Sequence, residues 1–562
     1  MKVNHLLNDI GCCLTLLAIT ISLFIYTVHI RRPWFAAISD SHHEWLTGST
    51  TIFAHNAYRD GPWQLRFANI FNPRSVEFPT LESRKMYPSY PPGTTLTIYA
   101  LAVLAGSEPS PALIMRYNLI NHFLIAFSLA LLTYLTVRQF SIGYLSATIF
   151  ATVPIIIELL MPAPLYWHQN VFFSDQAVTF PYVLIILLEA IRDSTNRKLT
   201  RWLVATLHAL LMFYGVLTDW LFTLVAPVLF LKRLLVEGVG TKHKLRNLLK
   251  TAVLFWAPPA LALGLFALQL SYFDNLPLLQ ERFACRTTGS TICNNFSGRF
   301  FAVFWQGYVR NGFGAPAIWL LWGSLAALVG NLWTTGLAKL FGKTPGPEFK
   351  HMASLAALLL VPSFLQTYIL KAHSGDHDFS ALKFTIPLAT LPLAIIPAFL
   401  VAQLRSKLPT AMFKRTAAVT AATLAIATIF YVAREHPRFS SFFPPPDPHS
   451  EHLGRFIQQY TDDNHIVFSP HFSIPELPPS QLAHSLKRVY SAHTWQDIKT
   501  FTDNIEDEYT IALVFLKEPD PQWTEPVGGT LYVNKVKQFY YLVVEPTSWQ
   551  RLARQLSMPP VQ

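Results

Sequence analysis

The chain has 562 residues, of which 51% are hydrophobic and only 14% are charged. This composition is too apolar for an ordinary soluble protein and indicates that most of the chain lies in a lipid bilayer. The net charge is +11, but the basic residues gather in short segments between apolar stretches rather than on one face. The sequence therefore predicts a polytopic membrane protein and argues against nucleic-acid binding.

The first predicted element is an apolar run over residues 10–30, which is long enough to cross a hydrocarbon core of about 30 Å. A cleaved signal peptide is the alternative, but its apolar region would be shorter, so the run is interpreted as an uncleaved first helix. A largely polar first loop follows over residues 31–117. Within it, residues 94–106 are apolar but short, and we expect them to be re-entrant or interfacial.

About ten further spans are predicted from apolar length, which makes about eleven in all. They lie near residues 118–137, 143–160, 177–191, 202–217, 219–231, 251–270, 314–333, 351–370, 381–402 and 416–433. Four basic loops set the orientation, because short cytoplasmic loops carry an excess of Lys and Arg. These loops are 192–201, 232–250, 339–350 and 405–415. The region after the last span is therefore expected outside the cytoplasm.

A Pro-rich linker over residues 437–450 separates a membrane domain, residues 1–436, from a more polar C-terminal region. Residues 451–562 contain β-type runs at 465–469, 510–516, 529–535 and 538–545, with helical patterns at 450–462 and 495–505. This pattern predicts a small extracytoplasmic α/β domain with its own core.

Titratable side chains follow the first helix directly, in the segment ISDSHHEW. Transfer of a group to a hydroxyl requires a base, and Asp40 is the candidate. Glu44 lies four residues later and would share a helical face with Asp40, where it could tune or orient it. The alternative is that this segment is only a hydrated interfacial loop.

Further candidates lie at the predicted outer ends of later segments. The turn YPSYPPG, residues 87–93, can hold a loop rigidly because proline restricts its own backbone and that of the preceding residue. Asp175, Asp219 and the segment HSGDH around His373 and His377 place ionisable groups near membrane depth, where they tend to mark sites. Asp219 could instead mark a tight turn between two spans. HSGDH could bind a divalent metal, although no cofactor is certain.

These motifs, in this order, resemble the GT-C superfamily of integral membrane glycosyltransferases, in particular the bacterial branch related to protein mannosyltransferases and aminoarabinose transferases. The resemblance covers roughly residues 1–435. Its elements are the acidic motif (Asp40, Glu44), an A-x-N-x-x-x-x-G stretch (Ala54, Asn56, Gly61), a YPP turn (Tyr90, Pro91, Pro92), Asp175, a TDW turn (Thr218, Asp219, Trp220) and a histidine-bearing loop (His373, His377).

The resemblance implies inverting displacement of a sugar from a polyprenyl-phosphate donor, with Asp40 catalytic. The acceptor would be a lipid, a glycan or a protein, and the enzyme would lie among membrane lipids in a bacterial inner membrane and serve the cell envelope. The acidic motif is spread as D-S-H-H-E, which leaves the division of roles between Asp40 and Glu44 open. Donor-phosphate binding is expected of Tyr87, Tyr90, His377, Lys383, Arg84 and Lys85, and cavity lining of His43, Asn56, Asp175, Asp219 and His373.

Two cysteines, Cys285 and Cys293, lie in a polar loop predicted outside the cytoplasm. In an oxidising compartment they can form a disulfide.

Two other functions are compatible with a polytopic chain. A transporter or lipid flippase would show repeated halves and charges near the bilayer midplane, whereas the charges here gather at outer ends. A membrane-anchored binding protein would act through its outer α/β domain alone. Loss of transfer on mutation of Asp40 would separate the enzyme from both.

Overall fold

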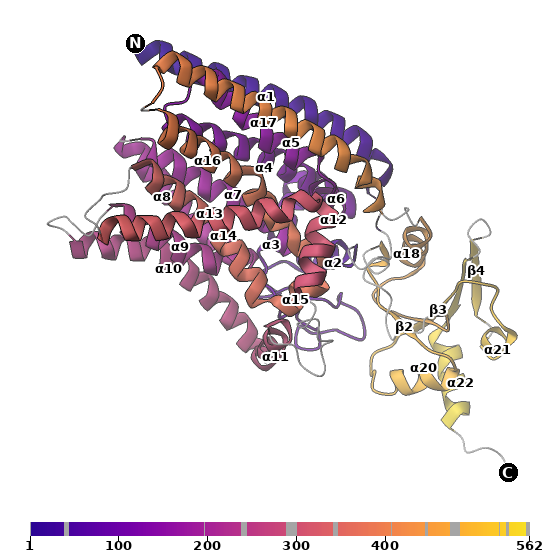
Figure 1. Cartoon of the computed structure of the whole chain (residues 1–562). Coiled ribbons are helices and arrows are strands. Elements are labelled where there is room, and N and C mark those ends of the chain that lie inside the picture. Colours follow the sequence, from indigo (N-terminus) through magenta and orange to yellow (C-terminus); the bar gives the residue numbers. More distant parts are fainter. Residues whose placement is uncertain are drawn as a thin grey trace. The chain divides into compact units, whose positions relative to one another are not determined.

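The computed structural model describes residues 2–36, 38, 44–195, 197–237, 244–287, 300–340, 347–405, 407–443, 448–471, 484–527, 529–534 and 539–557. The chain divides into two compact units, whose elements are labelled in Figure 1. The first unit comprises Met1–Pro33, Pro88–Gly93 and Arg116–Phe443, and the second comprises Trp34–Tyr87, Thr94–Met115 and Pro444–Gln562.

The first unit is helical. Helix α5 packs against α1 and α17, and α8 packs against α7 and α10. The long helices are α1 (Lys2–Arg31), α4 (Pro111–Gln139), α5 (Tyr144–Leu160), α7 (Ser174–Asp193), α8 (Lys198–Thr218), α9 (Leu221–Glu237), α10 (Lys244–Tyr272), α13 (Ala315–Leu340), α14 (Pro347–Ile369), α16 (Thr385–Leu404) and α17 (Thr410–Glu435). The short ones are α6 (Pro162–Asn170), α11 (Leu276–Thr287), α12 (Arg310–Phe313), α15 (Lys371–Asp376), the π-helix η3 (Ala302–Val309) and the 3₁₀ helices η1 (Arg32–Trp34), η4 (Asp378–Phe384) and η5 (His436–Ser441).

Seven helices among the described residues are long and apolar enough to cross a membrane, or eight if the bent pair α5 and α6 forms one span. The multi-pass membrane protein predicted from composition is therefore confirmed. The expected number of about eleven also counted shorter apolar helices as crossings. Two such helices are Ala315–Ala326 and Ser354–Ile369. A third short apolar helix, Gly93–Ala105, corresponds to the segment that was predicted to be re-entrant or interfacial and was not counted.

The span expected at 143–160 does not continue straight. Helices α5 and α6 meet at an angle of 59°, and Met161 between them is extended, with φ −74° and ψ 147°. Proline at position 162 explains the bend, because its ring disfavours helical geometry at the preceding residue. The same ring suits the first position of a new helix, and α6 begins there.

The second unit contains helices α2 (Glu44–Asp60) and α3 (Gly93–Ala105) and the C-terminal α/β domain. The domain's sheet has the order β2-β1-β3-β5-β4, with β1 parallel to β2 and β3, and β5 antiparallel to β3 and β4. Its elements are α18 (Pro448–Tyr460), β1 (His465–Ser469), β2 (Val489–Ser491), α20 (Trp495–Thr502), β3 (Thr510–Phe515), α21 (Pro521–Thr524), β4 (Thr530–Asn534), β5 (Phe539–Val544) and α22 (Pro546–Ser557).

Side chains of the central strands alternate between two buried clusters. In β3, Ile511 and Leu513 belong to the cluster that contains Trp495, whereas Ala512 and Val514 belong to the cluster that contains Phe456 of α18. This alternation follows from the two-residue period of a strand, and it shows that helices cover both faces of the sheet. The predicted α/β domain is confirmed, including all four predicted strands.

Candidate active site

A buried polar cluster lies where four elements of the first unit end or begin. Asp175 stands in the first turn of α7, and Lys383 stands in η4. Their side chains are 1% and 5% exposed, and Lys383 Nζ lies 2.5 Å from Asp175 Oδ1. A charged pair removed from solvent needs close partners, because each isolated charge would be costly to bury.

Asp219 belongs to the same cluster. It ends α8 in an extended conformation, and its Oδ1 accepts hydrogen bonds from Leu221 N at 2.8 Å and Gln366 Nε2 at 2.7 Å. The charges of Lys383 and Asp175 act on Asp219, so two carboxylates are grouped around one ammonium. Asp219 therefore serves both as the predicted turn between two spans and as part of a polar site.

Several buried atoms of this cluster retain hydrogen-bonding capacity. Asp219 Oδ2 and Gln366 Oε1 make no hydrogen bond within the described residues, and neither does Ser380 Oγ, three positions before Lys383 in η4. Buried polar atoms are nearly always paired in folded proteins, and exceptions tend to occur at functional sites. The cluster can therefore accept or donate further hydrogen bonds to a bound molecule.

The YPPG turn contributes a second group of side chains. Tyr90 Oη lies 3.3 Å from His373 Nε2, and its ring packs edge-on against Phe173, two residues before Asp175. The guanidinium of Arg286 lies 4.8 Å from the centre of the Tyr90 ring. A tyrosine hydroxyl, an imidazole and a guanidinium therefore lie within one small region.

His377 continues this group along the chain. Its ring lies 4.3 Å from that of His373 and stacks on Phe379 at 5.0 Å. Because Phe379 and Lys383 share η4, this helix links the histidines to the carboxylate cluster.

Gly93 anchors the turn against α8. A Cβ atom at this position would lie 2.6 Å from Leu217 O, and nearby Trp220 Nε1 donates a hydrogen bond to Ser89 O at 3.1 Å. Gly93→Ala is expected to destabilise the protein by about 1–3 kcal/mol, because a backbone atom at a helix end has little room to move. Thermal unfolding in detergent measures this loss of stability. The control Gly264→Ala lies in α10 with open space around it, and equal unfolding temperatures for both variants would contradict the close approach.

The first-loop candidates lie in part outside the described residues. Asp40 and His43 are among these, and Glu44 begins α2 but its side chain is not described. Tyr87 packs against Phe53 in the second unit, with ring centres 5.6 Å apart. The catalytic assignment of Asp40 and Glu44 therefore stays a prediction.

Two other first-loop candidates hold the fold of that loop. Asn56 Nδ2 donates to Ile70 O at 2.7 Å, and Arg84 Nε donates to Asn72 O at 2.8 Å. Arg84 also pairs with Asp60, with Nη1 2.6 Å from Oδ2. Lys85, by contrast, is exposed. Phosphate binding by Arg84 and Lys85 stays a prediction, and Arg84 has a structural role beside it.

The HSGDH segment was predicted as a possible metal site. Among the residues that the structure describes, no group of three or more His, Cys, Asp or Glu side chains could hold a metal ion. Cys285, near the end of α11, is disulfide-bonded. Cys293 lies outside the described residues, so the pairing of these two cysteines stays a prediction.

The sequence interpretation missed three buried polar residues inside predicted spans: Glu158, Glu189 and Gln366. Glu158 Oε1 lies 3.3 Å from His168 Nε2 and 3.7 Å from His122 Nε2, and all three side chains are fully buried. A lone acid or amide within an apolar run was the available signal. These spans were assigned on apolar length, which hides single polar residues.

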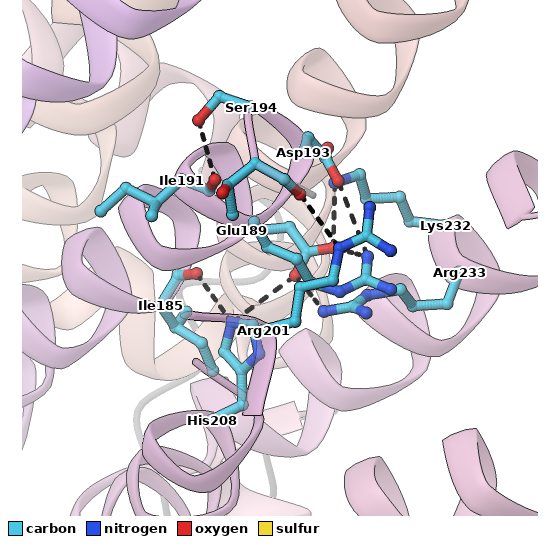
Figure 2. Close-up of polar contacts among 11 residues, drawn as sticks. Ile185, Glu189, Ile191, Asp193, Ser194, Arg201, His208, Lys232 and Arg233 are labelled. Atoms are coloured by element: carbon cyan, nitrogen blue, oxygen red, sulfur yellow. Dashed lines mark hydrogen bonds and ion pairs between the residues drawn. The ribbon is translucent and has the colours of Figure 1, made fainter. Parts of the chain in front are cut away.

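Glu189 is the centre of an ion-pair network at the C-terminal end of α7 (Figure 2). Its two oxygens lie 3.0 Å from Lys232 Nζ and 2.7 Å from Arg233 Nη2. His208 Nε2 lies 3.5 Å from Oε2, and Lys232 also pairs with Asp193 at 2.6 Å. The network joins α7, α8 and α9. Glu189 and His208 lie within predicted spans, whereas Lys232 and Arg233 were assigned to a basic loop.

The Glu189 network is separate from the Asp175 cluster. The two acids lie fourteen positions apart on α7, which corresponds to roughly 21 Å along the helix axis. The network therefore stabilises the helices at one end while the polar cluster occupies the other.

Glu189→Gln is expected to destabilise the protein by about 3–5 kcal/mol, because it removes the buried carboxylate that Lys232 and Arg233 share. Thermal or denaturant unfolding in detergent would measure the loss. The exposed residue Glu506 provides the control substitution Glu506→Gln. An unfolding midpoint for Glu189→Gln that equals that of the control would contradict a stabilising network.

No protein-family model and no curated protein matches the sequence. Solved structures of membrane transferases do match the fold. ArnT from Cupriavidus metallidurans in the apo state has a TM-score of 0.51 at 12% identity, covering 96% of this chain and 99% of that one. The same protein bound to undecaprenyl phosphate has a TM-score of 0.53 at 13% identity, with 95% and 98% covered.

The Archaeoglobus fulgidus oligosaccharyltransferase in its apo form has a TM-score of 0.53 at 12% identity, covering 95% of this chain and 74% of that one. Sequence identities this low support a shared fold but do not indicate a shared substrate. The chain therefore shares the fold of these solved structures, which is the GT-C fold that its motifs predicted.

Proposed function

We propose that this protein is a membrane glycosyltransferase that moves a sugar from a polyprenyl-phosphate donor to an acceptor outside the cytoplasm. The observation that carries the proposal is the shared fold over nearly the full length of both chains, including an ArnT structure that holds undecaprenyl phosphate. The motifs of the sequence support the same class of enzyme.

In the proposed reaction, an acceptor hydroxyl attacks the anomeric carbon of the donor sugar. Its proton passes to the Asp40 carboxylate, the bond between the anomeric carbon and the phosphate oxygen breaks, and polyprenyl phosphate leaves. Glu44 tunes or orients Asp40. This displacement inverts the configuration of the anomeric carbon.

The leaving phosphate requires positive charge. Lys383 supplies one cation, which Asp175 holds in place before the donor arrives. The two carboxylates of its cluster offset that charge, so Lys383 contributes an N–H donor to the phosphate and not excess positive charge. Arg286 supplies another beside Tyr90 and His373, which the sequence interpretation did not consider. Together they form a polar end of the first unit at which a phosphate can be bound.

The membrane is proposed to be a bacterial inner membrane. The C-terminal domain is proposed to lie outside the cytoplasm, because the basic loops mark the cytoplasmic face. Gln496→Cys, at an exposed position of α20, is expected to react with an impermeant thiol reagent in intact spheroplasts. Arg197→Cys, in a basic loop, is expected to react only after lysis. The opposite pattern would overturn the orientation.

Mass spectrometry of envelope glycans and lipids tests the function in cells. A strain lacking the protein is expected to lose one sugar modification and to accumulate the lipid-linked donor. Complementation with the wild-type gene restores the modification, whereas an Asp40→Asn gene does not. Identical glycan and lipid profiles in all strains would contradict the proposal.

A further inference from the structure

The second unit contains a hollow of about 490 Å³, a size typical of ligand sites. Four segments line it: α2, the chain after α3, the end of α18 with the turn that follows, and the segment before β2. The lining residues are His55, Tyr58, Arg59, Glu108, Gln458, Thr461, Asp462, Asp463, Ser485, Leu486 and Lys487.

The charged groups of this hollow hold one another in place. Asp463 accepts a hydrogen bond from Arg59 Nη1 at 2.9 Å, and Lys487 Nζ lies 3.6 Å from the same carboxylate oxygen. Burial acts to raise the pKa of Asp463, but the hydrogen bond and charge of Arg59 and the charge of Lys487 outweigh it and lower the pKa. Asp463 therefore stays ionised and holds both cations.

The charges also indicate the class of ligand. The lining has two cations, Arg59 and Lys487, against three carboxylates, and both cations face Asp463. Burial lowers the pKa of His55, so its imidazole is neutral at pH 7. Such a wall does not favour a phosphate, which needs excess positive charge. It suits a neutral ligand with many hydroxyl groups.

Two buried lining side chains keep hydrogen-bonding capacity. His55 and Lys487 are 8% and 7% exposed. His55 Nδ1 makes no hydrogen bond within the described part of the chain, and the only ion-pair partner of Lys487 Nζ there is Asp463, 3.6 Å away. Tyr58, Gln458 and Thr461 add an aromatic face, an amide and a hydroxyl. Sugar hydroxyls both donate and accept hydrogen bonds, which this mixture can match.

The backbone of the wall is strained at one point. Leu486 has φ +52°, a conformation that costs free energy for a residue with a branched side chain. Ser485 Oγ holds it by donating to Lys487 O at 2.9 Å and accepting from Lys487 N at 3.3 Å. Strain of this kind is retained mostly where a site requires a fixed wall.

We propose that this hollow binds sugar residues of a glycan and so holds the acceptor. The sugar-binding property stands on the geometry alone, whereas the role as acceptor site rests on the proposed function. The hollow differs from the cluster around Asp175, because all its residues belong to the second unit.

Saturation-transfer NMR on the full-length protein in nanodiscs tests the site, with glucose, galactose, mannose, N-acetylglucosamine and arabinose as probes at millimolar concentration. At least one sugar is expected to receive saturation. Gln458→Ala and Tyr58→Leu are each expected to weaken its binding about 3- to 10-fold. Gln459→Ala, the exposed neighbour on α18 that does not line the hollow, is expected to bind as the wild type does.

No saturation of any sugar, or equal saturation in wild type and both hollow variants, would overturn the site. Displacement of the sugar by inorganic phosphate at equal concentration would also overturn the assignment to a neutral ligand. Asp40→Asn is expected to keep full sugar binding. A wild-type protein that binds sugar but transfers nothing would refute the proposed function and support the sugar site. A wild-type protein that transfers sugar but shows no binding in the hollow would refute the sugar site and support the proposed function.

Discussion

Asp40→Asn is expected to lower turnover at least about 100-fold with little change in donor affinity, because asparagine keeps the shape of the side chain but cannot accept the acceptor proton. Glu44→Gln is expected to lower turnover by a smaller factor, since Glu44 tunes or orients the base. Purified variants would be compared by the rate of polyprenyl phosphate release and by binding of polyprenyl phosphate in nanodiscs.

The two readouts separate catalysis from folding. Retained lipid binding shows that Asp40→Asn is folded, so a loss of release then reports the missing base. An Asp40→Asn protein with wild-type turnover would refute the assignment. A larger loss in Glu44→Gln than in Asp40→Asn would exchange their roles.

Lys383→Met is expected to destabilise the protein by about 3–5 kcal/mol, because it leaves Asp175 charged and buried without its partner. The double variant Asp175→Asn/Lys383→Met removes both charges and is expected to recover most of that stability. Its donor affinity is nonetheless expected to fall about 10- to 100-fold, because a charge-assisted hydrogen bond to the phosphate is lost.

Unfolding midpoints and binding of polyprenyl phosphate would be measured on Lys383→Met, on Asp175→Asn and on the double variant. A double variant that folds and also binds the lipid as wild type does would show that the pair serves only the fold. Lys383→Arg is the matched control that keeps the positive charge.

Long apolar runs could be predicted because the bilayer sets the length of a span, and the strands of the C-terminal domain could be predicted because of their β-type composition. Strand β2 was missed, since its three residues are too few to show a period. The bend at Met161 was also missed, although Pro162 carried the signal.

The partners within the candidate site could not be predicted, because pairing between distant segments depends on how the helices pack. Asp175 and Lys383 were each identified as candidates, yet nothing in the sequence indicated that they form an ion pair. Gln366 was hidden in an apolar helix, and its hydrogen bond to Asp219 became visible only in the folded structure. The motif order predicts which residues form the site, and the fold shows which of these predicted residues contact one another.

The most direct test of the central claim uses lipid-linked sugars extracted from a strain that lacks the protein. These lipids would be incubated in liposomes with the purified protein and an envelope acceptor fraction from the same strain, and free polyprenyl phosphate would be measured by mass spectrometry. The proposal predicts release by the wild-type protein and almost none by Asp40→Asn. Lipid-linked sugars that remain intact but move between the two leaflets would contradict it and identify a flippase instead.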